Sequence, residues 1–328
     1  MHKLVVIGSN SFSGSSFVDL ALNQGAEVIG TSRSLEPVDA FLPYKWRPHQ
    51  RFVFHPLDLN KHLPELMELI KKFKPDYVVN FAAQSMVAES WRSPGDWFLT
   101  NAVSTIKLHE ELRHCDFLKR YVHVSTPEVY GSCSGFVKEN FSFNPSTPYA
   151  VSRAAADLSL NTFYQAYQFP VVTTRAANVY GPGQQLYRII PRTILFILLG
   201  RKLQLHGGGV STRSFIHMKD VSEATWRIME KGNNGSTYHI STREIVSIRE
   251  LVESICQKLG VHFEEHVEVV GERLGKDAAY QLDSTKLRKE LDWQDRFNLD
   301  QGLDDCIAWV RQHFDTLKSQ PYDYIHKP

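Results

Sequence analysis

The chain has 328 residues, of which 42% are hydrophobic and 22% charged, as in a globular rather than a disordered protein. Its 37 basic and 36 acidic residues give a formal net charge of +1, which excludes a charge excess of the kind that binds nucleic acid or a membrane surface. No apolar stretch is long enough to span a membrane, and the N-terminal run lacks the features of a signal peptide. The four cysteines form no CxxC pair, which favours free thiols and a cytoplasmic location.

Short apolar runs alternate with amphipathic stretches in the first half of the chain. Six strands are predicted, at residues 4–7, 27–31, 52–54, 77–81, 121–125 and 171–175. Helical periodicity is found between them, at residues 17–24, 63–73, 97–114 and 149–167. This β-α-β-α order predicts an α/β Rossmann fold, a doubly wound parallel sheet with helices on both faces.

The regular alternation ends near residue 178, where Gly181-Pro182-Gly183 breaks the chain. Beyond it we predict helices at residues 189–199, 221–231, 248–259 and 303–314, and short strands at 203–206 and 214–218. The pattern therefore indicates a Rossmann domain over residues 1–178 and a smaller mixed α/β substrate lobe over residues 179–328, partly interleaved with the first.

A run of small residues, Gly8-Ser9-Asn10-Ser11-Phe12-Ser13-Gly14, follows the first predicted strand and opens a helix. Small side chains let the backbone approach a pyrophosphate, and the free N–H groups of a helix N-terminus favour an anion. We therefore expect a nicotinamide dinucleotide to bind at Gly8, Ser11, Phe12 and Gly14. Ser11 stands where the GxxGxxG pattern of such sites has its middle glycine.

The second predicted strand ends at Thr31-Ser32-Arg33, without the Asp or Glu that NAD-selective enzymes place against the ribose hydroxyls. Arg33 is instead suited to hold a 2′-phosphate through charge-assisted hydrogen bonds. The sequence thus leaves NADP and NAD both open and slightly favours NADP.

Two segments are diagnostic of a family. Ser125-Thr126-Pro127-Glu128-Val129-Tyr130-Gly131 follows the fifth predicted strand, and Tyr149-Ala150-Val151-Ser152-Arg153 opens the next predicted helix. They resemble the S-T-x-E-x-Y-G and Y-x-x-x-K signatures of the sugar-nucleotide branch of the short-chain dehydrogenase/reductase superfamily. The chain is most similar there to GDP-mannose and dTDP-glucose 4,6-dehydratases, and the resemblance covers nearly its whole length.

The resemblance implies that Thr126, Glu128, Tyr149 and Arg153 carry the reaction. Oxidation at sugar C4 acidifies the C5 proton, and the Glu128 carboxylate is placed to take it. A tyrosine base has an ordinary pKa of about 10, so a neighbouring cation must lower it. The family uses Lys for this, whereas this chain has Arg153 at the i, i+4 position, a bulkier and planar cation.

Pro127 is a second departure from the family, since dTDP-glucose dehydratases have an Asp here that protonates the departing hydroxyl. We therefore hypothesise that Glu128 does both jobs, taking the C5 proton and passing it to the C6 hydroxyl.

Further site residues follow from the family order. Cofactor contacts are implied for Asp58, Ala82 and Asn101, and substrate contacts for Ser85, Asn178, Arg188, Arg213, Arg273 and Asp277. The arginines among them suit a diphosphate in a chain of near-zero net charge. One departure is Met86, where the dehydratases usually have a His.

The sequence as a whole indicates an NDP-hexose 4,6-dehydratase, which turns a nucleotide-diphosphate sugar into an NDP-4-keto-6-deoxy sugar. The alternatives are a UDP-glucuronate decarboxylase, a nucleotide-sugar epimerase or ketoreductase, and a non-catalytic nucleotide-sugar-binding protein motivated by Ser11 and Arg153. Similarity to relatives further predicts a homodimer. The HxxEH run at residues 262–266 lacks the long helix of zinc sites, so no metal is expected.

Overall fold

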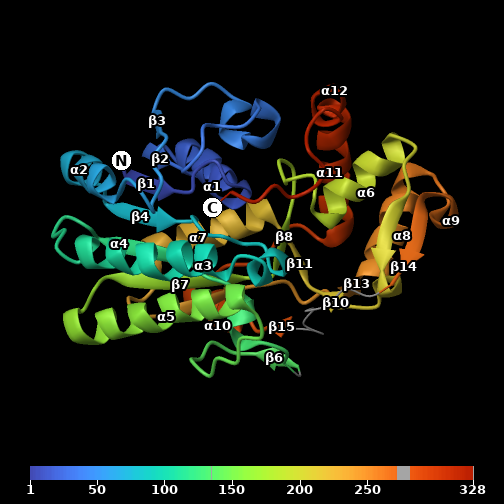
Figure 1. Ribbon diagram of the computed structural model, residues 1–328. Helices are drawn as coiled ribbons and strands as arrows, with labels where there is room; N and C mark the ends of the chain where they lie inside the picture. Colours follow the sequence, from blue (N-terminus) through green and yellow to red (C-terminus); the bar gives the residue numbers. More distant parts are fainter. Residues whose placement is uncertain (134, 272–280, 328) are drawn as a thin grey trace.

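A seven-stranded sheet forms the centre of the computed structural model, which describes residues 1–133, 135–271 and 281–327 (Figure 1). The strands follow the order β12-β7-β5-β4-β1-β2-β3, and each neighbouring pair is parallel. They are β1 (Lys3–Ile7), β2 (Glu27–Thr31), β3 (Phe52–His55), β4 (Tyr77–Asn80), β5 (Arg120–Val124), β7 (Val171–Ala176) and β12 (Thr237–Ile240). The predicted doubly wound parallel sheet is therefore confirmed.

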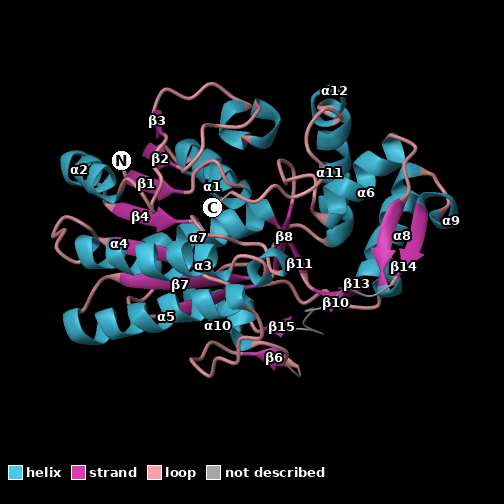
Figure 2. Cartoon of the chain, viewed as in Figure 1, coloured by secondary structure: helices cyan, strands magenta, loops and turns pink. Residues whose placement is uncertain are grey.

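Helices cover both faces of this sheet (Figure 2). One face is covered by α1 (Phe12–Asn23), α7 (Met218–Lys231) and α10 (Thr285–Leu291), and the other by α2 (Leu63–Phe73), α4 (Thr105–Leu112) and α5 (Pro148–Tyr167). The alternation of side chains along a strand divides the two cores: Leu4 and Val6 of β1 lie in one, Val5 and Ile7 in the other.

The edge strand β12 was not predicted from the sequence. All four of its residues are buried beside β7, but Thr237 and His239 interrupt the apolar run that would have marked a buried strand. The chain thus leaves the sheet after β7 and returns to it through α7, which packs on α1, and β12.

A further hydrophobic core lies outside the sheet, among α6 (Ile189–Leu198), α8 (Ile248–Leu259) and α11 (Leu299–Gln312). Three two-stranded pairs accompany it: β8 (Asn178–Tyr180) with β11 (Phe215–His217), β9 (Leu203–His206) with β14 (Val267–Val270), and β10 (Thr212–Arg213) with β13 (Val246–Ser247). Two short helices, α9 (Phe263–His266) and α12 (Phe314–Leu317), also contribute side chains to this core. A fourth pair, β6 (Phe136–Val137) with β15 (Gln281–Leu282), lies elsewhere, in a small cluster that includes Ala154 of α5.

Several predicted helices have other bounds in the structure, among them those predicted at residues 221–231 and 303–314, which begin three and four residues earlier. The helix predicted at residues 17–24 begins at Phe12, because Ser11 caps it. The helix predicted at 97–114 consists of α3 (Pro94–Phe98), a π-helical turn (Leu99–Ser104) and α4. Short 3-10 helices lie at Asp39–Phe41, Pro43–Lys45, Ala88–Trp91, Pro127–Tyr130 and Gly207–Gly209.

In the described ranges no helix has the length and apolar character needed to cross a membrane. Nor do these residues contain a group of three or more His, Cys, Asp or Glu that could hold a metal ion. No disulfide joins any of the four cysteines, all of which lie in these ranges.

Candidate active site

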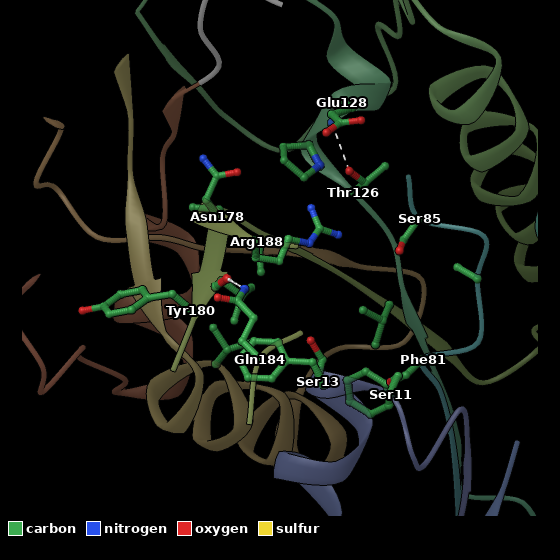
Figure 3. A pocket seen from close by; sticks show the side chains of 18 of the residues that line it. Ser11, Ser13, Phe81, Ser85, Thr126, Glu128, Asn178, Tyr180, Gln184 and Arg188 are labelled. Carbon is green, nitrogen blue, oxygen red and sulfur yellow. Dashed lines mark hydrogen bonds between the residues drawn. The ribbon is translucent and has the colours of Figure 1, made fainter. Parts of the chain in front are cut away.

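A cavity of about 450 Å³ lies at the carboxyl ends of the central strands, between the sheet and the segment that leads into α6. Parallel α/β sheets bind ligands at this edge. Figure 3 shows Thr126 and Glu128 at one end of the cavity, Ser11 and Phe81 at the other, and Arg188 reaching between them.

The turn after β1 is tightly built. Gly8 has φ +81°, and a Cβ there would lie 2.7 Å from the backbone nitrogen of Ala82, so no other residue fits. A Cβ on Gly14 would lie 2.1 Å from the carbonyl oxygen of Gly8. Ser11 accepts a hydrogen bond from the Gly14 N–H (3.1 Å) and donates to the Gly8 carbonyl (2.7 Å). Its side chain thereby caps α1, which explains how a serine replaces the middle glycine.

This turn fits the pyrophosphate of a dinucleotide. Gly8 and Gly14 have no side chains, so the backbone of the turn is open to close approach. The N-terminal N–H groups of α1 point toward the end of the cavity that Ser11, Phe12 and Ser13 line.

The opposite end of the cavity is formed by β5 and α5, and we call Thr126, Glu128, Tyr149 and Arg153 the β5–α5 wall. Thr126 follows β5 and caps a 3-10 turn, since its side-chain oxygen accepts a hydrogen bond from the Glu128 N–H (3.3 Å). Pro127 is the first residue of that turn, where its missing N–H costs nothing. All four residues of the wall line the cavity.

Burial raises the pKa of Tyr149, and the Glu128 carboxylate raises it further. The positive charge of Arg153, a hydrogen bond with Thr126 and the charge of Arg188 oppose these effects and lower the pKa. The cations needed for a tyrosine base are therefore in place, although burial outweighs them in this structure.

Arg153 is 2% exposed, and its Nη2 donates to the carbonyl oxygen of Val124, the last residue of β5. Within the described part of the chain its Nε has no hydrogen-bond partner, although it is buried at the cavity wall. A buried donor without a partner carries a large desolvation cost, so this group is suited to an acceptor on a bound ligand.

One turn further along α5, Asp157 joins the helix to the same strand end. Its Oδ2 accepts hydrogen bonds from the Ser125 hydroxyl (2.7 Å) and from Arg175 Nη2 (2.8 Å), and His123 Nε2 lies 3.3 Å from Oδ1. Burial alone would raise the pKa of Asp157, but the Arg175 charge and these hydrogen bonds hold it well below its usual range. Asp157 therefore remains charged and fixes α5 against β5.

Polar side chains from β8 and from segments further along the chain line the same cavity as the β5–α5 wall. Asn178 begins β8, Arg188 precedes α6 and Arg213 ends β10, and all three line the cavity together with Ser85. Arg273 and Asp277, also predicted to bind substrate, lie outside the described residues.

The sequence did not single out three further lining residues, Gln184, Gln185 and Tyr187. Gln184 Nε2 donates to the Val179 carbonyl (2.8 Å), which fixes the loop after β8. The Gly181-Pro182-Gly183 sequence could have indicated them, because it marks an irregular loop between two predicted elements, and such loops commonly carry ligand contacts.

Six predicted cofactor residues do not line this cavity. Gly8 and Gly14 shape the turn, and Ala82 packs against it. Asp58, in the segment after β3, is buried, and its carboxylate accepts a hydrogen bond from the Asn60 N–H (2.9 Å). The other two are Arg33 and Asn101.

Asn101 was expected to contact the cofactor, but it is fully buried in the π-helical turn. Its Oδ1 accepts a hydrogen bond from the Gln84 N–H (2.8 Å), and its Nδ2 donates to the Gln84 carbonyl (2.9 Å) and to the Ser152 hydroxyl (3.0 Å). Because both amide N–H groups and one acceptor site of the oxygen are engaged within the protein, Asn101 holds the loop after β4, and its contact with the cofactor stays a prediction.

Comparison with known proteins gives consistent results. The family model for GDP-mannose 4,6 dehydratase matches residues 5–306. The dTDP-glucose 4,6-dehydratase of Xanthomonas campestris pv. campestris is 30% identical, over 94% of this chain and 93% of that protein. DesIV, a dTDP-glucose 4,6-dehydratase from Streptomyces venezuelae solved with NAD bound, is 30% identical with a TM-score of 0.88, over 96% of this chain and 98% of that one. The NAD complex of a Bacillus anthracis dTDP-glucose 4,6-dehydratase is 28% identical with a TM-score of 0.87, over 97% and 99% of the two chains.

Proposed function

The chain belongs to the GDP-mannose 4,6-dehydratase family, and on that basis we propose that it is an NDP-hexose 4,6-dehydratase, a nicotinamide-dependent hydro-lyase. The observation that carries the proposal is the β5–α5 wall, where a tyrosine, a carboxylate and a hydroxyl line one cavity together with Arg188 and Arg213. Two arginines suit the diphosphate of the substrate, and the acid–base groups suit its sugar.

In the proposed reaction Tyr149 takes the proton of the sugar C4 hydroxyl, and Thr126 shares that hydrogen bond. The bound nicotinamide supplies a reversible hydride acceptor, so there is no net use of cofactor. Arg153 lowers the pKa of Tyr149 and presents its Nε to the ligand.

Glu128 is proposed to take the C5 proton and to return it to the departing C6 hydroxyl. Among the described residues it is the one carboxylate that lines the cavity, and Pro127 beside it has no proton to give. A single carboxylate serving both steps keeps the proton within the site.

NAD is the proposed cofactor. The sequence slightly favoured NADP, because no Asp or Glu follows the second strand and Arg33 stands there instead. The two solved dehydratases above carry NAD, and Arg33 Nη1 in this chain already donates to the carbonyl oxygen of Lys327 (2.6 Å). Glycine-turn contacts through Gly8 and Gly14 serve NAD and NADP equally.

The test is mass spectrometry of the purified protein incubated with UDP-, dTDP-, GDP- and CDP-hexoses, dTDP-glucose first because the relatives named above act on it. Loss of one water from one substrate is expected. Loss of carbon dioxide from UDP-glucuronate would establish the decarboxylase instead, and an isomer of unchanged mass would establish an epimerase. Cofactor and sugar binding with no turnover would leave a binding protein.

We also propose a homodimer formed by the outer face of α3, the π-helical turn and α5, which pack side by side. This face exposes Phe98, Leu99, Val103, Val151 and Leu158. Apolar side chains gathered on two adjacent helices suit a self-complementary interface. Light scattering should give a mass of twice that of the chain, and Leu158→Glu should lower the measured mass to that of a single chain.

A further inference from the structure

The last described residues, 321–327, form an extended segment that we call the C-terminal strap. Figure 1 shows the chain running from α12 back to its end near α1. Exposed and partly buried residues alternate along the strap, so Tyr322, Tyr324 and His326 all face the protein.

Each inward residue of the strap meets an aromatic ring on a different element. Tyr322 packs on Phe196 of α6, with ring centroids 5.7 Å apart, and Tyr324 packs on Tyr187 in the loop before α6, at 5.5 Å. Three aromatic contacts in chain order, the last described below, make this a defined path rather than a loose end.

His326 ends that path on α3. Its ring stacks on Trp97 at 4.9 Å and 15°, and its Nε2 lies 2.7 Å from Asp96 Oδ2. The strap thus runs from the substrate lobe, past Tyr187 at the wall of the cavity, to the Rossmann domain.

Beyond His326, the carbonyl oxygen of Lys327 accepts two hydrogen bonds. One comes from Gln84 Nε2 (2.7 Å) in the loop after β4, and the other from Arg33 Nη1 (2.6 Å) after β2. In the sheet β2 and β4 lie on either side of β1, so this oxygen bridges the two strand ends that flank the glycine turn.

We propose that the C-terminal strap determines cofactor selectivity, by holding Arg33 on the Lys327 carbonyl and away from a 2′-phosphate. The inference rests on the dinucleotide site of the proposed function and deepens it. NAD offers only a ribose hydroxyl at this position, whereas NADP offers a dianion that a freed guanidinium would bind in a charge-assisted pair. Lys327, 294 positions away in the chain, therefore keeps Arg33 from favouring NADP.

The test is a double-mutant cycle in the full-length chain, with Tyr324→Ala/His326→Ala to loosen the strap and Arg33→Ala to remove the guanidinium. Dissociation constants of NAD and NADP are measured by calorimetry without sugar. We expect the loosened strap to shift the affinity ratio toward NADP by about fivefold, the upper range for an exposed ion pair. Adding Arg33→Ala to the loosened chain should abolish that shift, and high salt should weaken it.

An unchanged NAD to NADP ratio in the loosened chain, with both cofactors bound, would overturn the role of the strap but leave the dehydratase intact. A shift that persists after Arg33→Ala would also overturn it, since the guanidinium would then not be the group released. Failure of the wild-type chain to bind either cofactor would contradict the proposed function itself. Thermal unfolding of each variant identifies any that is misfolded, and His326→Ala alone, which removes the stack on Trp97 and the contact with Asp96, then replaces the loosening pair.

Discussion

The β5–α5 wall and the contact between Arg33 and the C-terminal strap both depend on an arginine, but the surroundings of the two arginines differ. Arg153 is 2% exposed and, next to it, Asp157 and Arg175 are 3% and 0% exposed. The Arg33–Lys327 bond is solvent-exposed. A group in the wall that loses its partner leaves a charge or donor in a low-dielectric interior. At the exposed Arg33–Lys327 contact, water replaces a lost partner. Substitutions in the wall should therefore have the larger effects.

The largest effect is expected for Glu128→Gln. Removing the proposed acid–base carboxylate should lower the rate of water loss by about 100-fold or more, measured by mass spectrometry. Glu139→Gln is the matched control: its carboxylate accepts the His239 N–H (2.9 Å) outside the cavity lining, and the amide oxygen can still do so. Wild-type water release by Glu128→Gln would refute the role given to this carboxylate.

Arg153→Met should lower turnover by about 100-fold, because Tyr149 loses a cation that lowers its pKa. With that pKa raised further, the remaining activity should rise at higher pH than in the wild type. Arg153→Lys, the residue of the family signature, should keep most of the activity and an unshifted pH–rate profile. Equal losses in both variants would instead indicate that packing of the guanidinium matters more than its charge.

Asp157→Asn tests the support of the wall rather than its chemistry. Leaving Arg175 buried without its counter-ion should cost about 3 kcal/mol of unfolding free energy near pH 7, measured in urea. The folded pKa of Asp157 is lowered, so its stabilisation is present above the unfolded pKa of about 3.9 and is lost as pH falls below it. The difference in unfolding free energy between Asp157→Asn and the wild type should therefore become smaller as the pH is lowered below about 3.9.

The exposed pair Asp315–Lys318 provides the comparison for that result. Asp315→Asn should change stability by less than about 0.5 kcal/mol at any of these pH values. If both substitutions cost the same, burial would not be what distinguishes the wall.

At the glycine turn the expected effect is smaller than that of Asp157→Asn. Ser11→Ala removes the cap on the Gly14 N–H and should cost about 1 kcal/mol, whereas Ser11→Gly, the family residue, should cost only a few tenths. Chemical unfolding of the two variants compares them directly. A larger loss for glycine than for alanine would mean that the backbone, not the cap, is what Ser11 contributes.

Much of the Rossmann half could be predicted because its signals are local. Strands such as β2 and β4 are apolar runs between helical stretches, and their predicted bounds agree with the structure to within one residue. The start of α1 was placed five residues late, because Ser11–Ser16 has poor helix propensity and the helix there depends on the Ser11 cap and on burial. The π-helical turn around Asn101 leaves no periodic signal, so its role in holding the loop after β4 could not be read from the sequence.

The sequence by itself determined the chemical groups of this protein: a glycine turn, a tyrosine with a cation four residues later, and one carboxylate beside a threonine. Tertiary structure alone decided which of these groups meet. It brought Arg188 to the β5–α5 wall, placed β12 beside β7, and bound Arg33 to a carbonyl at the far end of the chain. The reason is that local pattern reports local conformation, while contacts between distant residues depend on how whole elements pack.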